Sequence, residues 1–123
     1  MAKYARRVAM ALCKANPIAG IPYKGEHFDE ETGKCLLTLT QRANNLLKEI
    51  GTYGAYVVEG DPHGWDGDSV CTISMEPKGG DDDVTMPLDY WEGGDEVSCD
   101  ASGMLKGLFI EFANAGVACV YKI

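Results

Sequence analysis

The order of hydrophobic and polar residues changes its period along the chain, from helical in the first part to alternating further on. In the first segment, apolar residues recur at four-residue spacing, at Tyr4, Val8 and Leu12. This spacing predicts a helix over residues 3–15 that ends before Pro17. The basic residues of this segment fall around its other side, where a solvated polar face is the simplest interpretation.

A second helix is predicted to begin after Thr38. The sequence Thr38-Leu-Thr-Gln41 is a capping box, in which the Thr38 hydroxyl and the Gln41 amide bond to free backbone N–H groups. An apolar stripe follows, made of Leu39, Ala43, Leu46, Leu47 and Ile50. Gly51 is placed to end this helix, because glycine accepts the left-handed conformation found after helix C-termini. The connection over residues 17–34 is expected to be irregular.

Beyond the second helix the period becomes two, which is typical of strands. Three strands are predicted, at residues 53–58, 71–75 and 84–90. Pro87 lacks an N–H donor, so the last of these strands is expected at a sheet edge or beside a bulge. The final residues, 117–123, alternate again and predict a terminal strand.

A third helix is predicted before the terminal strand. Asp100 or Ser102 would cap its N-terminus, and Gly116 would end it. Its apolar face would consist of Met104, Leu105, Leu108, Phe109 and Phe112. We therefore expect one α+β domain over residues 1–123, with about three helices on one face of a mostly antiparallel sheet of about four strands.

Acidic residues are concentrated in one third of the chain. Residues 59–100 hold thirteen carboxylates against one base, Lys78, and this block accounts for the whole net charge of −8. A field of one sign on one part of a small fold repels like-charged molecules and attracts basic ones. The block is therefore a candidate binding surface, and direct binding to nucleic acid is not expected.

The five cysteines are too widely spaced for a zinc-binding pair, and their odd number cannot be fully paired. Free, mostly buried thiols are expected, and a disulfide framework is the alternative. The basic N-terminus precedes an apolar stretch too short for a secretory or membrane-spanning segment. These features predict a cytoplasmic protein without a membrane partner.

The search for catalytic and metal-binding motifs finds no match. His27 and His63 lack the neighbouring histidine or cysteine of a zinc site, and the serines lack the flanking glycines of a nucleophile elbow. Gly93-Gly94 is followed by acids that would repel a phosphate. The aspartate-rich loops lack the spacing of a twelve-residue calcium loop. We expect a non-enzymatic protein without a cofactor or a metal.

The function that these features favour is binding to another protein. Duplex DNA presents one negative charge per about 1.7 Å of axis, so grooves that bind it are lined with Lys and Arg. A folded domain with carboxylates at comparable density would occupy such a basic surface and exclude the nucleic acid. Charges would steer the encounter, and aromatic rings would anchor it. The candidate contact residues are Trp65, Asp66, Asp68, Asp81, Asp82, Asp83, Asp89, Trp91, Asp95 and Glu96.

In general style, a short, acidic chain without motifs looks like the small inhibitors that phages and mobile elements use against host nucleic-acid machinery, including anti-restriction and anti-CRISPR proteins. This likeness rests on no particular residue.

Three alternatives stay open. An acidic surface also serves solubility alone. A small enzyme, or a ligand- or metal-binding protein, would be centred on His63, Asp66 and Asp68 in the loop 60–68. A self-associating protein, such as a homodimer, would pair through the strand at 84–90.

Overall fold

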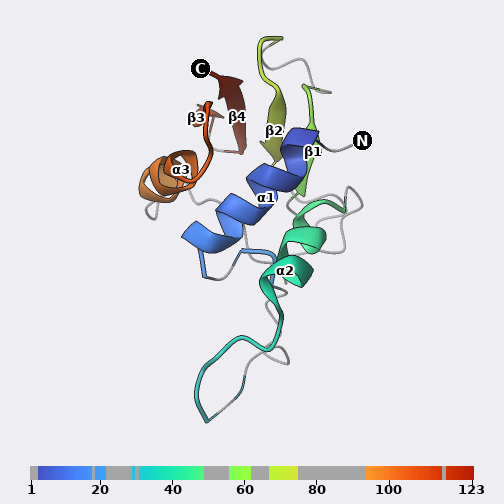
Figure 1. Ribbon diagram of the computed structural model, residues 1–123, viewed down its shortest axis with the longest axis vertical. Helices are drawn as coiled ribbons and strands as arrows, with labels where there is room; N and C mark the ends of the chain where they lie inside the picture. The colour runs from blue at the N-terminus through green and yellow to red at the C-terminus, as the bar shows by residue number, and fades with distance from the viewer. Residues whose placement is uncertain are drawn as a thin grey trace.

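The computed structural model forms one antiparallel sheet with three helices in the residues that it describes. These residues are 3–17, 19–21, 29, 31–48, 56–61, 67–74, 94–114 and 116–123. In chain order the elements are α1 (Lys3–Ala15), α2 (Leu39–Leu46), β1 (Tyr56–Glu59), β2 (Cys71–Ser74), α3 (Gly94–Gly103), β3 (Leu108–Asn114) and β4 (Val117–Lys122). The strand order is β1-β2-β4-β3 (Figure 1). The predicted α+β class is confirmed.

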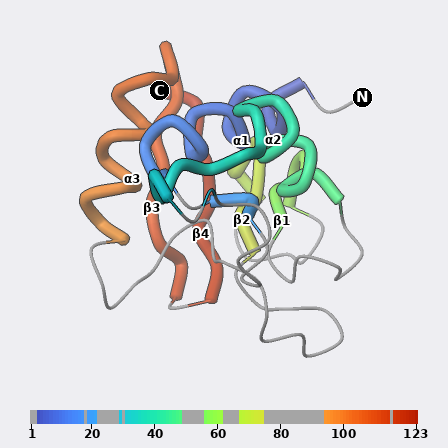
Figure 2. The backbone as a smooth tube through the Cα atoms, turned by 90° about the horizontal axis from the view of Figure 1, so that it is seen from below, coloured from blue at the N-terminus to red at the C-terminus, as the bar shows by residue number. Residues whose placement is uncertain are grey.

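The core lies between α1 and one face of the sheet. Figure 1 shows α1 crossing in front of the strands, with α2 beside it near β1 and α3 on the side of β3; Figure 2 shows the same arrangement from below. Alternation along each strand sends every second side chain towards α1. The strand residues of this core are Val57, Cys71, Ile73, Leu108, Ile110, Ala118 and Val120. None of the described helices has the length and apolarity needed to cross a lipid bilayer.

The opposite face of the central strands is also buried. The register places Thr72 opposite Cys119 and Ser74 opposite both Tyr56 and Val117. All of these side chains are buried, including the two polar ones. The Thr72 hydroxyl donates to the Gly60 carbonyl at 2.8 Å, which satisfies this buried group. The sheet is therefore shielded from water on both sides over its central part.

The N-terminus of α1 is capped by a carboxylate from β1. A helix leaves its first N–H groups without partners, and neither Met1 nor Ala2 carries a side chain that could accept from them. Glu59 supplies the acceptor. The Tyr4 and Ala5 N–H groups each donate to Glu59 Oε1 at 2.7 Å, and Tyr4 N–H also donates to Oε2 at 3.1 Å. The negative charge also opposes the positive end of the helix dipole.

The C-terminus of α1 is capped by a buried cation from α2. Arg42 is only 8% exposed, and its guanidinium donates to three carbonyls in and after the last turn of α1. These are the carbonyls of Cys13 at 3.1 Å, Asn16, and Ala19 at 2.8 Å. The carbonyl dipoles at this end of the helix compensate a charge that would otherwise be costly to bury.

The turn after α1 must approach α2 closely for this contact. Gly20 has a φ of +76°, and a Cβ at this position would lie 2.3 Å from the Arg42 carbonyl oxygen. Glycine is required on both counts. The Asn45 side chain donates to the Gly20 carbonyl at 2.9 Å, so a second buried polar residue of α2 holds the same turn.

The third helix is present, but it lies earlier in the chain than predicted. This helix is α3, and Leu108–Asn114 is strand β3. Gly107 has a φ of +78°, which ends any helical continuation from α3. In β3, burial alternates from Leu108 to Glu111, because pairing with β4 sends Ile110 to the core and Glu111 to solvent. Gly116 lies in the turn between β3 and β4, where its N–H donates to Asn114 Oδ1 at 2.8 Å.

The other predicted elements that fall within the described residues agree with the structure except at their ends. The helix over residues 3–15 and the terminal strand are confirmed, and the Thr38–Gln41 capping box is present in both directions. Helix α2 ends at Leu46, earlier than predicted, and Gly51 is outside the described residues. The strand predicted at 53–58 is observed at Tyr56–Glu59. The strand predicted at 84–90 falls outside the described residues.

Replacing the Glu59 carboxylate should destabilise the fold. Glu59→Gln keeps an acceptor but loses the charge, so we expect a loss of about 1 kcal/mol in the free energy of unfolding; Glu59→Ala should cost about 2 kcal/mol. Urea denaturation followed by circular dichroism measures both. Glu31→Gln, which removes a carboxylate charge at an exposed position, is the control, and an equal effect of Glu31→Gln and Glu59→Gln would contradict the capping role.

Replacing the buried Arg42 should have a larger effect. Arg42→Met keeps much of the apolar stem but leaves three carbonyls without this donor, so we expect a loss of about 3 kcal/mol. Thermal and urea unfolding measure it. Arg6→Met, at an exposed position on α1, is the matched control. Similar stabilities of the two variants would show that the guanidinium does not fix the end of α1.

Candidate protein-binding surface

Helix α3 begins with two carboxylates in its first turn. Asp95 and Glu96 follow Gly93-Gly94, and both side chains are exposed. Carboxylates at this position stabilise a helix, because they face the positive end of its dipole. Their placement therefore has a structural reason, and any binding role comes in addition to it.

The inner face of α3 is fixed to the edge strand β3 by two serines. Ser98 Oγ donates to the Ile110 carbonyl at 2.9 Å, and Ser102 Oγ accepts from the Ile110 N–H at 2.7 Å. Ser98 and Ser102 are four residues apart and so lie on the same face of the helix. They satisfy the outward backbone groups of Ile110, which the edge strand would otherwise present to another strand.

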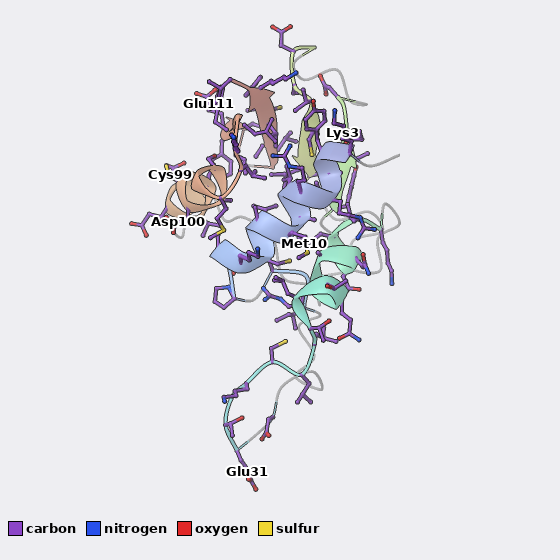
Figure 3. All side chains as sticks on the ribbon, in the orientation of Figure 1. Lys3, Met10, Glu31, Cys99, Asp100 and Glu111 are labelled. Carbon is purple, nitrogen blue, oxygen red and sulfur yellow. The ribbon has the colours of Figure 1, made fainter. Side chains whose placement is uncertain are left out.

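The acidic side chains of α3 are exposed, with Glu96 and Asp100 on the side away from the serines and Asp95 at the border between the two sides. Glu96 and Asp100 are four residues apart, as are Asp95 and Cys99. These four side chains line a shallow hollow of about 370 Å³. Figure 3 shows Cys99 and Asp100 projecting away from the sheet and from α1.

A second hollow, of about 400 Å³, lies between α3 and β3. Asp95, Ser98 and Cys99 line it from the helix, and residues 110–114 line it from the strand. The exposed Glu111 adds a fourth carboxylate on this side of the molecule (Figure 3). Among the described residues that line the two hollows there is no Lys or Arg. We call Asp95, Glu96, Asp100 and Glu111 the acidic surface.

The structure brings two of the predicted contact residues together. Asp95 and Glu96 share the outer face of α3. Asp68 is exposed in the turn before β2 and lines neither hollow. Glu59, the first carboxylate of the acidic block, faces α1 and belongs to the fold. The remaining predicted residues, which lie outside the described part of the chain, are Trp65, Asp66, Asp81, Asp82, Asp83, Asp89 and Trp91.

Asp100 and Glu111 are members of this surface that the sequence pattern does not predict. The pattern predicts Asp100 as a helix cap and Glu111 as part of the same helix, because it places the third helix too late in the chain. The signal that identifies α3 is the pair of acids directly after Gly93-Gly94, which is typical of a helix start.

No group of three or more histidine, cysteine or carboxylate side chains in the described ranges is arranged to hold a metal ion. His63 and Asp66, which the ligand-binding alternative requires, are outside these ranges. The acidic surface is therefore considered as a surface for charged groups of another molecule.

None of the five cysteines is in a disulfide, and they differ in accessibility. Cys13, Cys71 and Cys119 are buried, Cys35 is half-buried and Cys99 is exposed within the acidic surface. Burial raises the pKa of the Cys13 thiol to about 11, although the charge of Arg42 acts in the opposite direction. Burial also raises the pKa of Cys71, and the nearby carboxylate of Glu59 adds to this shift.

Thiol labelling should therefore distinguish Cys99 from the buried cysteines. Between about pH 7 and pH 9 the Cys13 thiol stays protonated in the folded protein, because burial disfavours its thiolate. We expect a maleimide to modify Cys99 first, and Cys13 and Cys71 only after unfolding. Peptide mapping by mass spectrometry measures the order. Modification of Cys13 as fast as Cys99 in the folded protein would contradict the described packing.

Comparisons with known proteins give no relative: no family model, no curated protein and no solved structure matches this chain.

Proposed function

We propose that this protein is a non-enzymatic inhibitor that binds a basic, nucleic-acid-binding surface of a partner protein. The acidic surface on α3 and β3 would contact Lys and Arg side chains of the partner. The other carboxylates predicted for this contact, Asp66, Asp68, Asp81, Asp82, Asp83 and Asp89, would extend it, with Trp65 and Trp91 as anchors. Occupation of the basic surface would keep nucleic acid out.

The observation that supports the proposal is the spacing of carboxylates along α3. Asp95, Glu96 and Asp100 are exposed on one face and span about 7.5 Å of helix axis, given a rise of about 1.5 Å per residue. The mean spacing is about 4 Å. Phosphates along one strand of DNA lie about 3.4 Å apart along the axis. The two steps, about 1.5 Å from Asp95 to Glu96 and about 6 Å from Glu96 to Asp100, are uneven, so the likeness to a phosphate backbone lies in the mean charge density along the axis.

The rigid support of α3 favours the same function. The helix is fixed to β3 by Ser98 and Ser102, and its Ala101 and the following Leu105 belong to the same core cluster as the buried residues of α1. Its carboxylates are held in place before binding, so little backbone entropy is lost on association. Solubility alone does not require such support, because charges on a mobile segment serve it equally well.

Charge reversal on the outer face of α3 tests the proposal. We expect tagged protein to capture basic, nucleic-acid-handling proteins from a lysate of its host cells at about 0.1 M salt and to release them at about 0.5 M salt, because screening weakens exposed charge pairs. Asp100→Lys should reduce capture about tenfold or more. Added duplex DNA should compete with the wild type for the captured partner.

Glu31→Lys is the matched control, because it makes the same charge change at an exposed position far from α3 (Figure 3). Equal capture by Asp100→Lys and Glu31→Lys would contradict a role of the acidic surface. A captured partner that binds its nucleic acid and this protein at the same time would contradict inhibition by occupation. Circular dichroism confirms that both variants fold.

A further inference from the structure

A basic and apolar hollow of about 270 Å³ lies where α1 meets the C-terminal end of α3. Three cations of α1 and two methionines line most of it: Arg6, Arg7, Lys14, Met10 and Met104, with Ala11 and Leu105 at its base. Arg6, Met10 and Lys14 recur every four residues and so form one row along α1. Met104 is 50% exposed. We call this set the basic hollow.

The basic hollow adjoins the acidic surface. Met104 lines the basic hollow and lies four residues after Asp100, so the last acidic residue of α3 is one helical turn away from the hollow. Helices α1 and α3 pack against each other, and Figure 1 shows the C-terminal end of α1 close to α3. The two surfaces of opposite charge therefore lie next to each other, on either side of the seam between the helices.

We infer that a second copy of this chain docks on the basic hollow through its own acidic α3, in a two-fold symmetric dimer. With neighbouring surfaces of opposite charge, a two-fold axis close to the seam lets each copy place its carboxylates on the cations of the other. Both contacts are then made at once, and the interface closes without further growth. This inference does not depend on the proposed function.

The composition of the seam fits such an interface. Methionine and arginine are enriched at protein interfaces, and charged side chains belong at the rim around an apolar centre. Here Met104 lies at the junction of the two surfaces, with Arg6 and Lys14 on one side and Asp100 on the other. In the two-fold arrangement the Met104 side chains of the two copies meet close to the axis.

Sedimentation of the purified protein at low salt, about 50 mM, tests the dimer. We expect a monomer–dimer equilibrium that shifts to monomer as salt rises. Arg6→Glu with Lys14→Glu should raise the dimer dissociation constant about tenfold or more, and so should Asp100→Lys. An equimolar mixture of the two variants should associate again, because the reversed surfaces are complementary. Failure of the mixture to associate would overturn the inference.

Cross-linking tests the position of the axis. In a background with Cys99→Ser, Met104→Cys should form a covalent dimer on mild oxidation of the two thiols, because the two positions meet across the axis. Ile123→Cys, at a residue 84% exposed outside the hollow, is the control and should give no covalent dimer. Equal cross-linking of both variants, or a monomeric wild type whose hollow instead binds an anionic polymer such as heparin, would overturn the dimer.

Discussion

The charged capping of α1 at both ends is the interaction on which the rest of the structure depends. A helix carries positive partial charge at its N-terminus and negative at its C-terminus. Glu59 brings a negative charge to the N-terminus of α1 from 55 residues away in the chain. Arg42 brings a positive charge to its C-terminus from 26 to 29 residues away. The two contacts fix β1 and α2 relative to α1, and α1 is the helix that covers the sheet. Local capping would stabilise α1 equally well but would leave β1 and α2 held to it by the apolar contacts of the core alone.

The position of α3 follows from that of α1 and β3. One face of α3 packs against the core and holds the Ile110 backbone with two serines, so a single helix side both fills the core and protects the sheet edge. Polar residues that satisfy a strand edge must face inward, and the carboxylates are left on the outer face. The acidic surface is thus a consequence of how α3 is attached, as well as of its composition.

The proposed partner contact and the inferred dimer use the same carboxylates. Each would therefore exclude the other on a given copy, and a partner would bind only the copies whose acidic surface is free. Self-association would lower the apparent affinity for a partner at high protein concentration and would not affect it at low concentration. Since both contacts are largely electrostatic, both would weaken with salt, while the packing of the core would not.

The sequence by itself determined the elements whose signals are local. Helix α1 has a clear four-residue period, α2 has its capping box, and the alternation at residues 71–75 and 117–123 identified β2 and β4. Only the tertiary structure decided the conformation of Leu108–Asn114. The spacing of its apolar residues fits both a helix and a strand, and pairing with β4 selects the strand. The same holds for the charges. Composition located the acidic block, but neighbours distant in sequence turned Glu59 inward to cap a helix and brought Glu111 beside Asp95, since burial and pairing act through space.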